Sequence, residues 1–299
     1  MQQVKVWLQK ADAAYQRFRF KRKGRSVTLD ILMFLFLGFF AFFSIWPLLL
    51  ILFNAFKPMS EIFLFPPRLM VENPTLNNFR DLSILISNSW VPVSRYIFNT
   101  VFITVVGTVG TVLIASMAAF PLAKYRFPGS RVMSEMITYA LMFNGTVLTV
   151  PVYLIMSYLN LVDSYWAILL PAFTHTLGLF LMRNFMTQIP DSLLEAAKID
   201  GARELRIFGS IVMPVCKPAW ITLIILSFQT LWGETGGQLI YTETLKPFSY
   251  AISQIVNSGV ARTGAASASS LIMLIVPVTV FIISQNNVLE TMATSGIKE

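Results

Sequence analysis

The sequence has little charge and few of the residues that form disulfides or bind metals. Of its 299 residues, 13% are charged, about half the share of a soluble domain, and 55% are apolar. It has one cysteine, Cys216, and one histidine, so a disulfide within the chain is excluded and a cysteine-based metal site is not expected. It also lacks the Gly-x-x-x-x-Gly-Lys-Ser/Thr pattern of a phosphate-binding loop. We therefore expect a membrane protein that is not an enzyme and that holds no metal or cofactor of its own.

Six apolar runs are long enough to cross a bilayer as helices. About 20 residues are needed for a crossing, and none of the runs alternates polar and apolar residues as a barrel strand would. The runs are Ile31–Phe53, Phe98–Leu122, Met133–Tyr158, Tyr165–Met182, Pro214–Trp232 and Ala265–Ile283. The sequence thus predicts an all-α membrane protein with six transmembrane helices and both termini on one side.

Basic residues set the predicted orientation. They gather before the first run and in the loops between the second and third runs and between the fourth and fifth runs. Because cytoplasmic loops carry an excess of Lys and Arg, both termini and these two loops are predicted to be cytoplasmic. The net charge of +8 then reflects topology and contact with anionic lipid, and nucleic-acid binding is not expected.

These features divide the chain into five parts. They are a basic arm (1–30), a first transmembrane helix (31–56), an external segment (57–95), a five-helix transmembrane domain (96–288) and a cytoplasmic tail (289–299). The external segment is rich in proline and cannot form one long helix. The transmembrane domain includes a cytoplasmic loop at 184–213.

That cytoplasmic loop carries a spaced motif. Ser192 and Glu195 form a capping-box pattern that predicts a short helix, and Gly201 can end it in the left-handed conformation. A second helical stretch is expected from Ala202 to Ser210, and Pro214 can open the fifth membrane helix at its first turn. The residues of the motif are Glu195, Ala196, Ala197, Asp200, Gly201, Ile211 and Pro214.

The motif resembles the signature of the membrane-spanning subunits of ATP-binding cassette (ABC) importers, with Met213 where that family has Leu. The resemblance implies a type I importer permease fold in the bacterial inner membrane. It implies that the loop is a coupling helix that docks on a separate ATPase, which binds ATP and magnesium. The implied partners are a second homologous permease, two ATPase subunits and an external solute-binding protein.

Further segments resemble the carbohydrate-importing branch, and in it the smaller maltose-type permease. They are Asn54–Pro58, Glu61–Ile62, Pro66–Pro67, Pro74–Phe79, Asn99–Thr100, Ala118–Ala123 and Phe127–Gly129. By the same resemblance, the tail contacts the ATPases through Ser295, Gly296, Ile297 and Lys298. One stretch departs from the branch, since Trp232-Gly233 stands where sugar permeases often have Trp-Asn. Together with Asn287–Ala293, it resembles permeases for complex polysaccharides and alginate oligosaccharides, which implies larger, acidic oligosaccharides such as alginate or pectin fragments.

Polar residues within the apolar runs are the candidates for a substrate path, because each is costly in a membrane unless it has a partner. The alternatives are helix packing for Asn144 and Thr146, a hydrogen bond to a neighbouring helix for His175, and interface anchoring for the aromatic residues. The candidates are Asn144, Thr146, His175, Gln229, Trp232, Glu234 and Tyr241.

Two other functions remain open at this point. One is an ABC permease for a non-sugar solute, which the loop motif alone does not exclude. The other is an ion-coupled secondary transporter. Such transporters usually have ionisable residues at mid-membrane, whereas Glu135 is the only carboxylate here near a helix interior, and it lies close to the cytoplasmic end.

Overall fold

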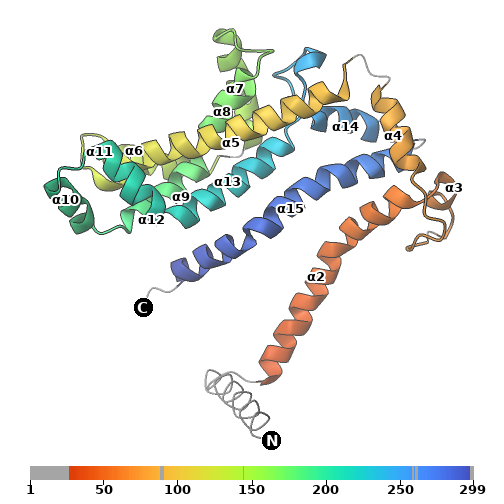
Figure 1. Ribbon diagram of the computed structural model, residues 1–299, viewed down its shortest axis with the longest axis horizontal. Helices are drawn as coiled ribbons and strands as arrows, with labels where there is room; N and C mark the ends of the chain where they lie inside the picture. Colours follow the sequence, from red (N-terminus) through yellow and green to blue (C-terminus); the bar gives the residue numbers. More distant parts are fainter. Residues whose placement is uncertain are drawn as a thin grey trace, which may run out of the picture. The chain divides into compact units, whose positions relative to one another are not determined.

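The computed structural model describes residues 27–66, 68–87, 91–143, 145–257, 259 and 262–296 and contains helices but no strands in these ranges (Figure 1). The chain divides into two compact units, Met1–Phe53 and Asn54–Glu299. The helices are α2 (Val27–Phe56), α3 (Met59–Ile62), α4 (Asn77–Ser87), α5 (Val93–Lys124), α6 (Ser130–Ala140), α7 (Gly145–Tyr158), α8 (Trp166–Phe173), α9 (Thr176–Thr187), α10 (Asp191–Ile199), α11 (Glu204–Ile207), the π-helix η1 (Phe208–Val212), α12 (Met213–Val215), α13 (Lys217–Trp232), the 3-10 helix η2 (Glu243–Leu245), α14 (Phe248–Val256) and α15 (Thr263–Gly296).

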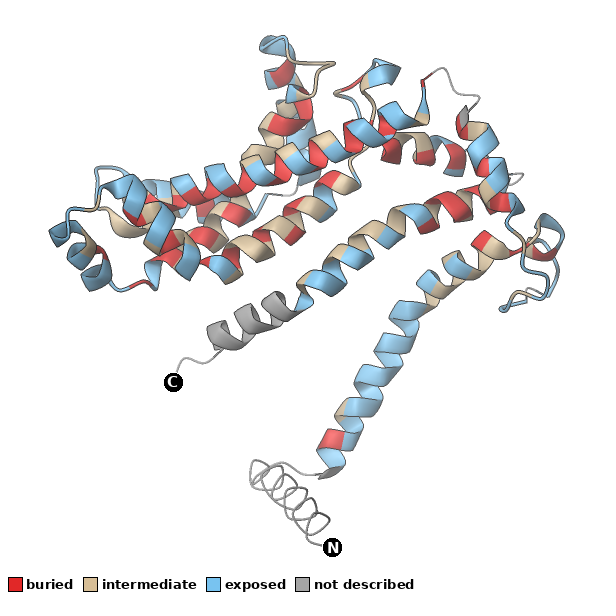
Figure 2. Cartoon of the chain, viewed as in Figure 1, coloured by how far each residue is buried: buried red, intermediate tan, exposed pale blue. Residues whose placement is uncertain are grey.

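The first unit contains most of α2, a helix that is apolar on all sides. Figure 2 shows exposed residues along nearly all of its length, and its phenylalanines contact one another rather than a core. A helix without a polar face is stable only in an apolar environment, which is the setting of a membrane span. A helix is thus present where the first transmembrane helix is predicted, and it has the length and composition of a membrane span.

In the second unit, α5 is the central helix, and it packs against α8, α9, α13 and α14. Figure 1 shows α5 and α13 side by side. Two glycines allow neighbouring helices to approach α5: a Cβ at Gly107 would lie 2.5 Å from Leu231 of α13, and one at Gly110 would lie 2.2 Å from Phe173 of α8. Small residues at helix contacts are typical of membrane bundles.

The main core lies at one end of this bundle. Ala119 and Phe120 of α5, Met182 and Met186 of α9, and Leu223 of α13 are buried together there. The cluster also includes side chains from the loop that the sequence predicts to be cytoplasmic, namely Leu194, Ile207 and Val212. The loop is therefore packed onto the bundle.

The number of membrane spans is between four and six. Four helices are long and apolar enough among the residues described: Thr28–Phe56, Val93–Lys124, Trp166–Thr187 and Thr263–Gln285. Two bent pairs raise the number to six if each counts as one span: Ser130–Ala140 with Gly145–Tyr158, and Glu204–Val215 with Lys217–Trp232. Six spans thus stay a prediction.

The start of the fifth span was predicted wrongly. Pro214 lies in α12, and α13 begins at Lys217 after a bend of 80°. The cause is Pro218 in the first turn of α13, which has no N–H to give to the carbonyl of Pro214 and whose ring would meet that carbonyl in a continuous helix. The chain therefore turns at Cys216 before it enters the span.

The external segment contains two helices, α3 and α4, as its prolines predicted. The buried Asn78 amide of α4 donates to the carbonyls of Asn54 (3.3 Å), Ala55 (2.9 Å) and Lys57 (2.7 Å) at the end of α2. The buried carboxylate of Glu61 accepts from the backbone N–H groups of residues 72 and 73. This segment is thus an ordered structure that closes the carboxyl end of α2.

Candidate functional site

The predicted coupling helix corresponds to α10, but its cap differs from the prediction. The helix begins at Asp191 after Pro190, and no side chain caps it, so Ser192 lies in the first turn and makes no capping box with Glu195. The extended N-cap position is Pro190, two residues earlier than the expected Ser192. The Asp191 carboxylate instead provides negative charge at the positive end of the helix.

The end of α10 agrees with the prediction. Asp200 follows the last helical residue, and Gly201 takes a positive φ of 77°. The N–H of Gly201 donates to the carbonyl of Lys198 (3.0 Å), and that of Ala202 donates to Ala197 (2.9 Å). The left-handed glycine therefore satisfies the last carbonyls of the helix.

One face of α10 is buried and the other is open. Leu194 is buried in the main core, whereas Glu195 and Ala196 are exposed and Ala197 is partly buried. Beside them, Ile199 is 86% exposed. Glu195, Ala196 and Ile199 thus face away from the core, where a second protein can approach them, whereas Ala197 packs against the core.

The second helical stretch begins later, extends further and is less regular than predicted. It consists of α11, the π-helix η1 and α12. Ile211 of η1 packs against the main core, and Pro214 is exposed. Single π turns occur often at functional sites because they shift side chains relative to a regular helix.

Two adjacent residues at the end of α5 hold this loop, and sequence reasoning missed both roles. Lys124 donates to the carbonyl of Ile189 and forms an ion pair with Asp191 at 2.7 Å. The Tyr125 hydroxyl donates to Glu204 and accepts from Lys198 at 3.3 Å. Lys124 was interpreted only as a topology signal, because contacts between residues so distant in sequence leave no periodic pattern.

The charges around Tyr125 support one another. Lys198 and Glu204 form an ion pair at 2.8 Å, and the Lys198 ammonium lies 5.1 Å from the centre of the Tyr125 ring. Burial and the hydrogen bond with Glu204 raise the pKa of Tyr125. Hydrogen bonds to Glu204 and Tyr125 raise the pKa of Lys198. At physiological pH, Tyr125 is therefore a neutral phenol, Lys198 an ammonium and Glu204 a carboxylate.

At the opposite end of α5, a second network fixes the loop before α14. Asn99 is fully buried and donates to the carbonyls of Thr244 (2.9 Å) and Lys246 (2.8 Å). Thr100 accepts from the N–H of Phe248 at 2.7 Å, and Tyr96 donates to Glu243 at 2.6 Å. Both ends of α5 thus hold loops that come from distant parts of the sequence.

Asp163 completes this network and was not expected. It has a positive φ of 63°, and its carboxylate accepts from the N–H groups of Tyr241 (2.9 Å) and Thr242 (2.8 Å) and from the Thr242 hydroxyl. These hydrogen bonds, the side-chain bond from Thr242 first, hold the pKa of Asp163 below its usual value. Asp163 therefore stays ionised and ties the loop that carries Tyr241.

The structure brings three of the predicted path residues to the same loop region, and each of them has an internal partner. The Trp232 indole donates to the carbonyl of Met273 (3.2 Å), and the Glu234 carboxylate accepts from the N–H of Gly236 (2.9 Å). Tyr241 is 58% exposed, and its hydroxyl bonds that of Tyr153. Gln229 is exposed near the end of α13.

His175 lies in the break between α8 and α9 and has a local partner. Its Nδ1 accepts from the N–H of Gly178 at 2.9 Å, so the imidazole caps α9 rather than bonding a neighbouring helix. It borders a largely apolar cavity of about 400 Å³ formed with α5 and α6. The His175 side chain thus lines this cavity, and the lining includes no residue of the loop that carries Tyr241.

Several of the predicted residues are exposed or lie outside the described residues. Thr146 is exposed at the start of α7, and Asn144 lies outside the described residues. The helix α15 extends to Gly296, but the side chains of Ser295 and Gly296 are not described, and Ile297, Lys298 and the basic arm before Val27 also lie outside the described residues. Among the residues described, no group of three or more potential metal ligands is present.

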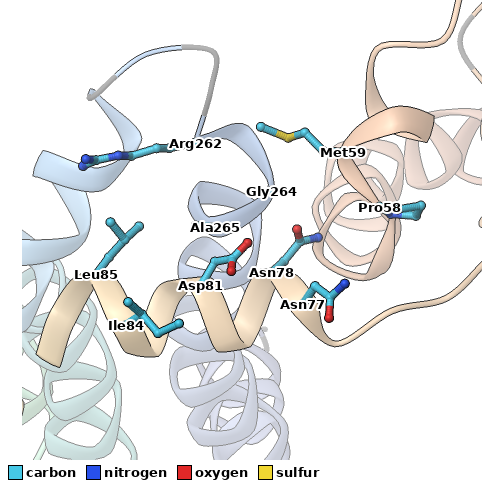
Figure 3. A pocket seen from close by; sticks show the side chains of 10 residues that line it. All are labelled: Pro58, Met59, Asn77, Asn78, Asp81, Ile84, Leu85, Arg262, Gly264 and Ala265. Atoms are coloured by element: carbon cyan, nitrogen blue, oxygen red, sulfur yellow. The ribbon is translucent and has the colours of Figure 1, made fainter.

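A further opening lies on the external segment (Figure 3). This cavity of about 410 Å³ is lined by Asn77 and Asp81 of α4 and by Arg262 before α15. Its polar groups can bond hydroxyls or peptide groups of a ligand.

Comparison with known proteins identifies the chain. Residues 111–292, more than half of the chain and including the whole of the α10 loop, match the family described as binding-protein-dependent transport system inner membrane component. The chain belongs to this family. It is therefore a multi-pass inner-membrane protein, the membrane component of a transport system, and ATP hydrolysis is carried out by a separate subunit.

Relatives cover most of the chain. Protein LplC of Bacillus subtilis is 30% identical over 71% of this chain and 70% of its own length. The polygalacturonan/rhamnogalacturonan transport system permease protein YtcP of Bacillus subtilis is 29% identical over 76% of this chain and 78% of its own. The arabinooligosaccharides transport system permease protein AraQ of Halalkalibacterium halodurans is 27% identical over 93% and 99%.

A solved structure has the same fold. A chain of a bacterial ABC transporter involved in the import of the acidic polysaccharide alginate matches with a TM-score of 0.75 over 88% of this chain and 98% of that one, at 23% identity. The predicted all-α fold of an ABC importer permease is confirmed by this match.

Proposed function

We propose that this family member is the permease subunit of an ATP-driven importer for oligosaccharides, and that α10 couples it to the ATPase. The observation that carries the proposal is the geometry of α10 in a chain of this family. Its inner face is anchored in the bundle core through Leu194, and its outer face presents Glu195 and Ala196. An anchored helix with an open face can pass movement from a docked protein to the bundle.

The proposed substrate class is acidic oligosaccharides from pectin or alginate. One relative is named for polygalacturonan and rhamnogalacturonan, whose galacturonate units are acidic, and it supports this class. Another is named for arabinooligosaccharides, which are neutral, and it supports only an oligosaccharide substrate. The resemblance of Trp232–Tyr241 to complex-polysaccharide permeases supports the same class. We propose that substrate contacts the exposed Gln229 and Tyr241, and that Asn144, Thr146 and His175 lie further along the path.

The proposed assembly has four other protein subunits: a second homologous permease, two ATPase subunits and an external solute-binding protein. The ATPase subunits bind ATP and magnesium, and lipid surrounds the membrane-spanning part. The excess of Lys and Arg in the basic arm and the α10 loop supports cytoplasmic termini. In this assembly Ser295, Gly296, Ile297 and Lys298 contact the ATPases.

One relative favours a second candidate. The sn-glycerol-3-phosphate transport system permease protein UgpE of Yersinia enterocolitica is 29% identical over 67% of this chain. A small phosphorylated solute is therefore the alternative substrate. Uptake of labelled sn-glycerol-3-phosphate and of pectin fragments by the same vesicles separates the two.

The coupling role is tested by uptake in vesicles that contain the whole complex. We expect Glu195→Lys and Gly201→Pro to abolish uptake while the complex still inserts and assembles. Gly209→Ala is the matched control, because a Cβ at Gly209 meets nothing within 4 Å and its φ is ordinary, whereas Gly201 has a positive φ. Normal uptake by Glu195→Lys or Gly201→Pro would refute the role of α10.

A further inference from the structure

We propose that Lys124 and Tyr125 are the positioning residues through which α5 follows the movement of α10. The inference rests on the proposed function, since it concerns how an ATPase docked on α10 moves the bundle. The two residues are adjacent in the sequence, and between them they hold both ends of α10.

Lys124 holds the amino-terminal end. Its side chain is 5% exposed, and its ammonium bonds the carbonyl of Ile189 and the carboxylate of Asp191. Asp191 is 75% exposed, so the lysine is the buried partner of the pair. A buried ammonium that loses its acceptors is costly, and this makes the contact hard to break as α10 moves.

Tyr125 holds the carboxyl-terminal end and the next helix. Its hydroxyl donates to Glu204 of α11 and accepts from Lys198 of α10, and its ring packs edge-on against Phe120 at 5.6 Å between centroids. Phe120 in turn packs against Phe208 of η1. One side chain thus joins α5, α10 and α11.

These two contacts prevent α10 from sliding or tilting independently of α5. A nine-residue helix that is held near residues 189–191 and at Lys198 has no free end. Hydrogen bonds to charged groups are among the strongest in proteins, and Leu194 adds burial between them. A displacement of α10 is therefore passed to the end of α5.

α5 carries that displacement across the membrane. It has 32 residues, which corresponds to about 48 Å of helix. Its far end holds the loop before α14 through Asn99 and Thr100. The loop of residues 243–248 is therefore the external element that responds to α10. At the other end, the motif residue Glu195 is exposed and makes the contact with the ATPase.

The test uses Tyr125→Phe in the reconstituted complex. ATPase activity is measured with and without binding protein and oligosaccharide, which gives the stimulation ratio, and uptake per ATP is measured in the same complex. The ring packing is retained and only the hydroxyl contacts are lost. We expect normal assembly and basal ATPase activity, but a stimulation ratio lowered about fivefold or more, with a matching fall in uptake per ATP. A purely structural role would instead lower yield and basal activity together.

Two further variants make the result specific. Tyr139→Phe is the matched control, since Tyr139 is 62% exposed on α6, and it should keep the wild-type ratio. Lys198→Glu should lower the ratio, and adding Glu204→Lys should restore much of it by re-forming the ion pair in reverse. A wild-type ratio in Tyr125→Phe would overturn the inference alone. No ATP-driven uptake by the wild-type complex would overturn the proposed function, and the inference with it.

Discussion

The contact between Asn78 and Gly264 gives the sharpest prediction of stability. Asn78 is 5% exposed, and its amide donates to the three carbonyls at the end of α2. Asn78→Ala removes all three bonds and leaves buried acceptors without a donor. Because each lost bond costs about 1 kcal/mol and an unpaired buried group about 1–3 kcal/mol, we expect a loss of about 2–4 kcal/mol in the free energy of unfolding.

The same contact predicts the effect of a change on α15. A Cβ at Gly264 would lie 2.2 Å from the Asn78 Oδ1 atom, so Gly264→Ala must displace the amide from its acceptors. Overpacking of this kind costs about 1–3 kcal/mol. In the Asn78→Ala background the clashing atoms are absent, so the same substitution should cost much less. The double variant should therefore be more stable than the sum of the single changes predicts, by about 1–2 kcal/mol.

The assay is denaturant unfolding of the purified complex in detergent, followed by tryptophan fluorescence. Asn77→Ala is the control, because Asn77 is the exposed neighbour on the same helix. Additive effects of Asn78→Ala and Gly264→Ala, or a loss below about 0.5 kcal/mol for Asn78→Ala, would refute the argument.

Three further predictions follow from other contacts. Gly110→Ala should destabilise the bundle by about 1–3 kcal/mol, since its Cβ would meet the Phe173 ring at 2.2 Å; an unchanged unfolding midpoint would contradict this. Asp163→Ala should increase protease cleavage of the loop at Thr242. Asp163→Asn should have the smaller effect, because asparagine also tolerates the positive φ of this position. Equal cleavage of the two variants would contradict the role given to the hydrogen bonds of Asp163. The pKa of Asp163 is lowered in the folded state. Its contribution to stability should therefore be complete at neutral pH and lost as the pH falls through that lowered pKa. In a pH titration of cleavage, the Asp163→Asn variant should not show this pH dependence. Cys216 is 1% exposed and should resist maleimide labelling until the protein unfolds, and rapid labelling of the native complex would show that the bend before α13 opens.

The membrane helices and the α10 loop could be predicted because their signals are local. The length of an apolar run predicts a membrane span, and the spacing from Glu195 to Gly201 predicts a short helix that ends at a glycine. The predicted cap was wrong because the N-cap is Pro190, two residues before Ser192, and the helix begins at Asp191. The start of α13 was misplaced because Pro214 and Pro218 both suit a first turn, and the sequence alone does not say which one is used.

The contacts that organise the site could not be predicted, because they join residues far apart in sequence. Asn99 and Lys246, or Tyr125 and Glu204, meet only when the bundle has formed. Asn78 lies in a segment whose family resemblance was noticed, but its role became clear only from the three carbonyls that surround it. Local patterns thus predicted the elements, whereas the packing decided their contacts.

The most direct test of the proposed function is the ATPase activity of the complex. The chain would be co-expressed with its second permease, ATPase subunits and binding protein, placed in nanodiscs, and assayed with neutral and acidic oligosaccharides. The proposed function predicts stimulation by acidic oligosaccharides from pectin or alginate, with little response to maltose. No association with an ATPase, or uptake driven by an ion gradient without ATP, would contradict it.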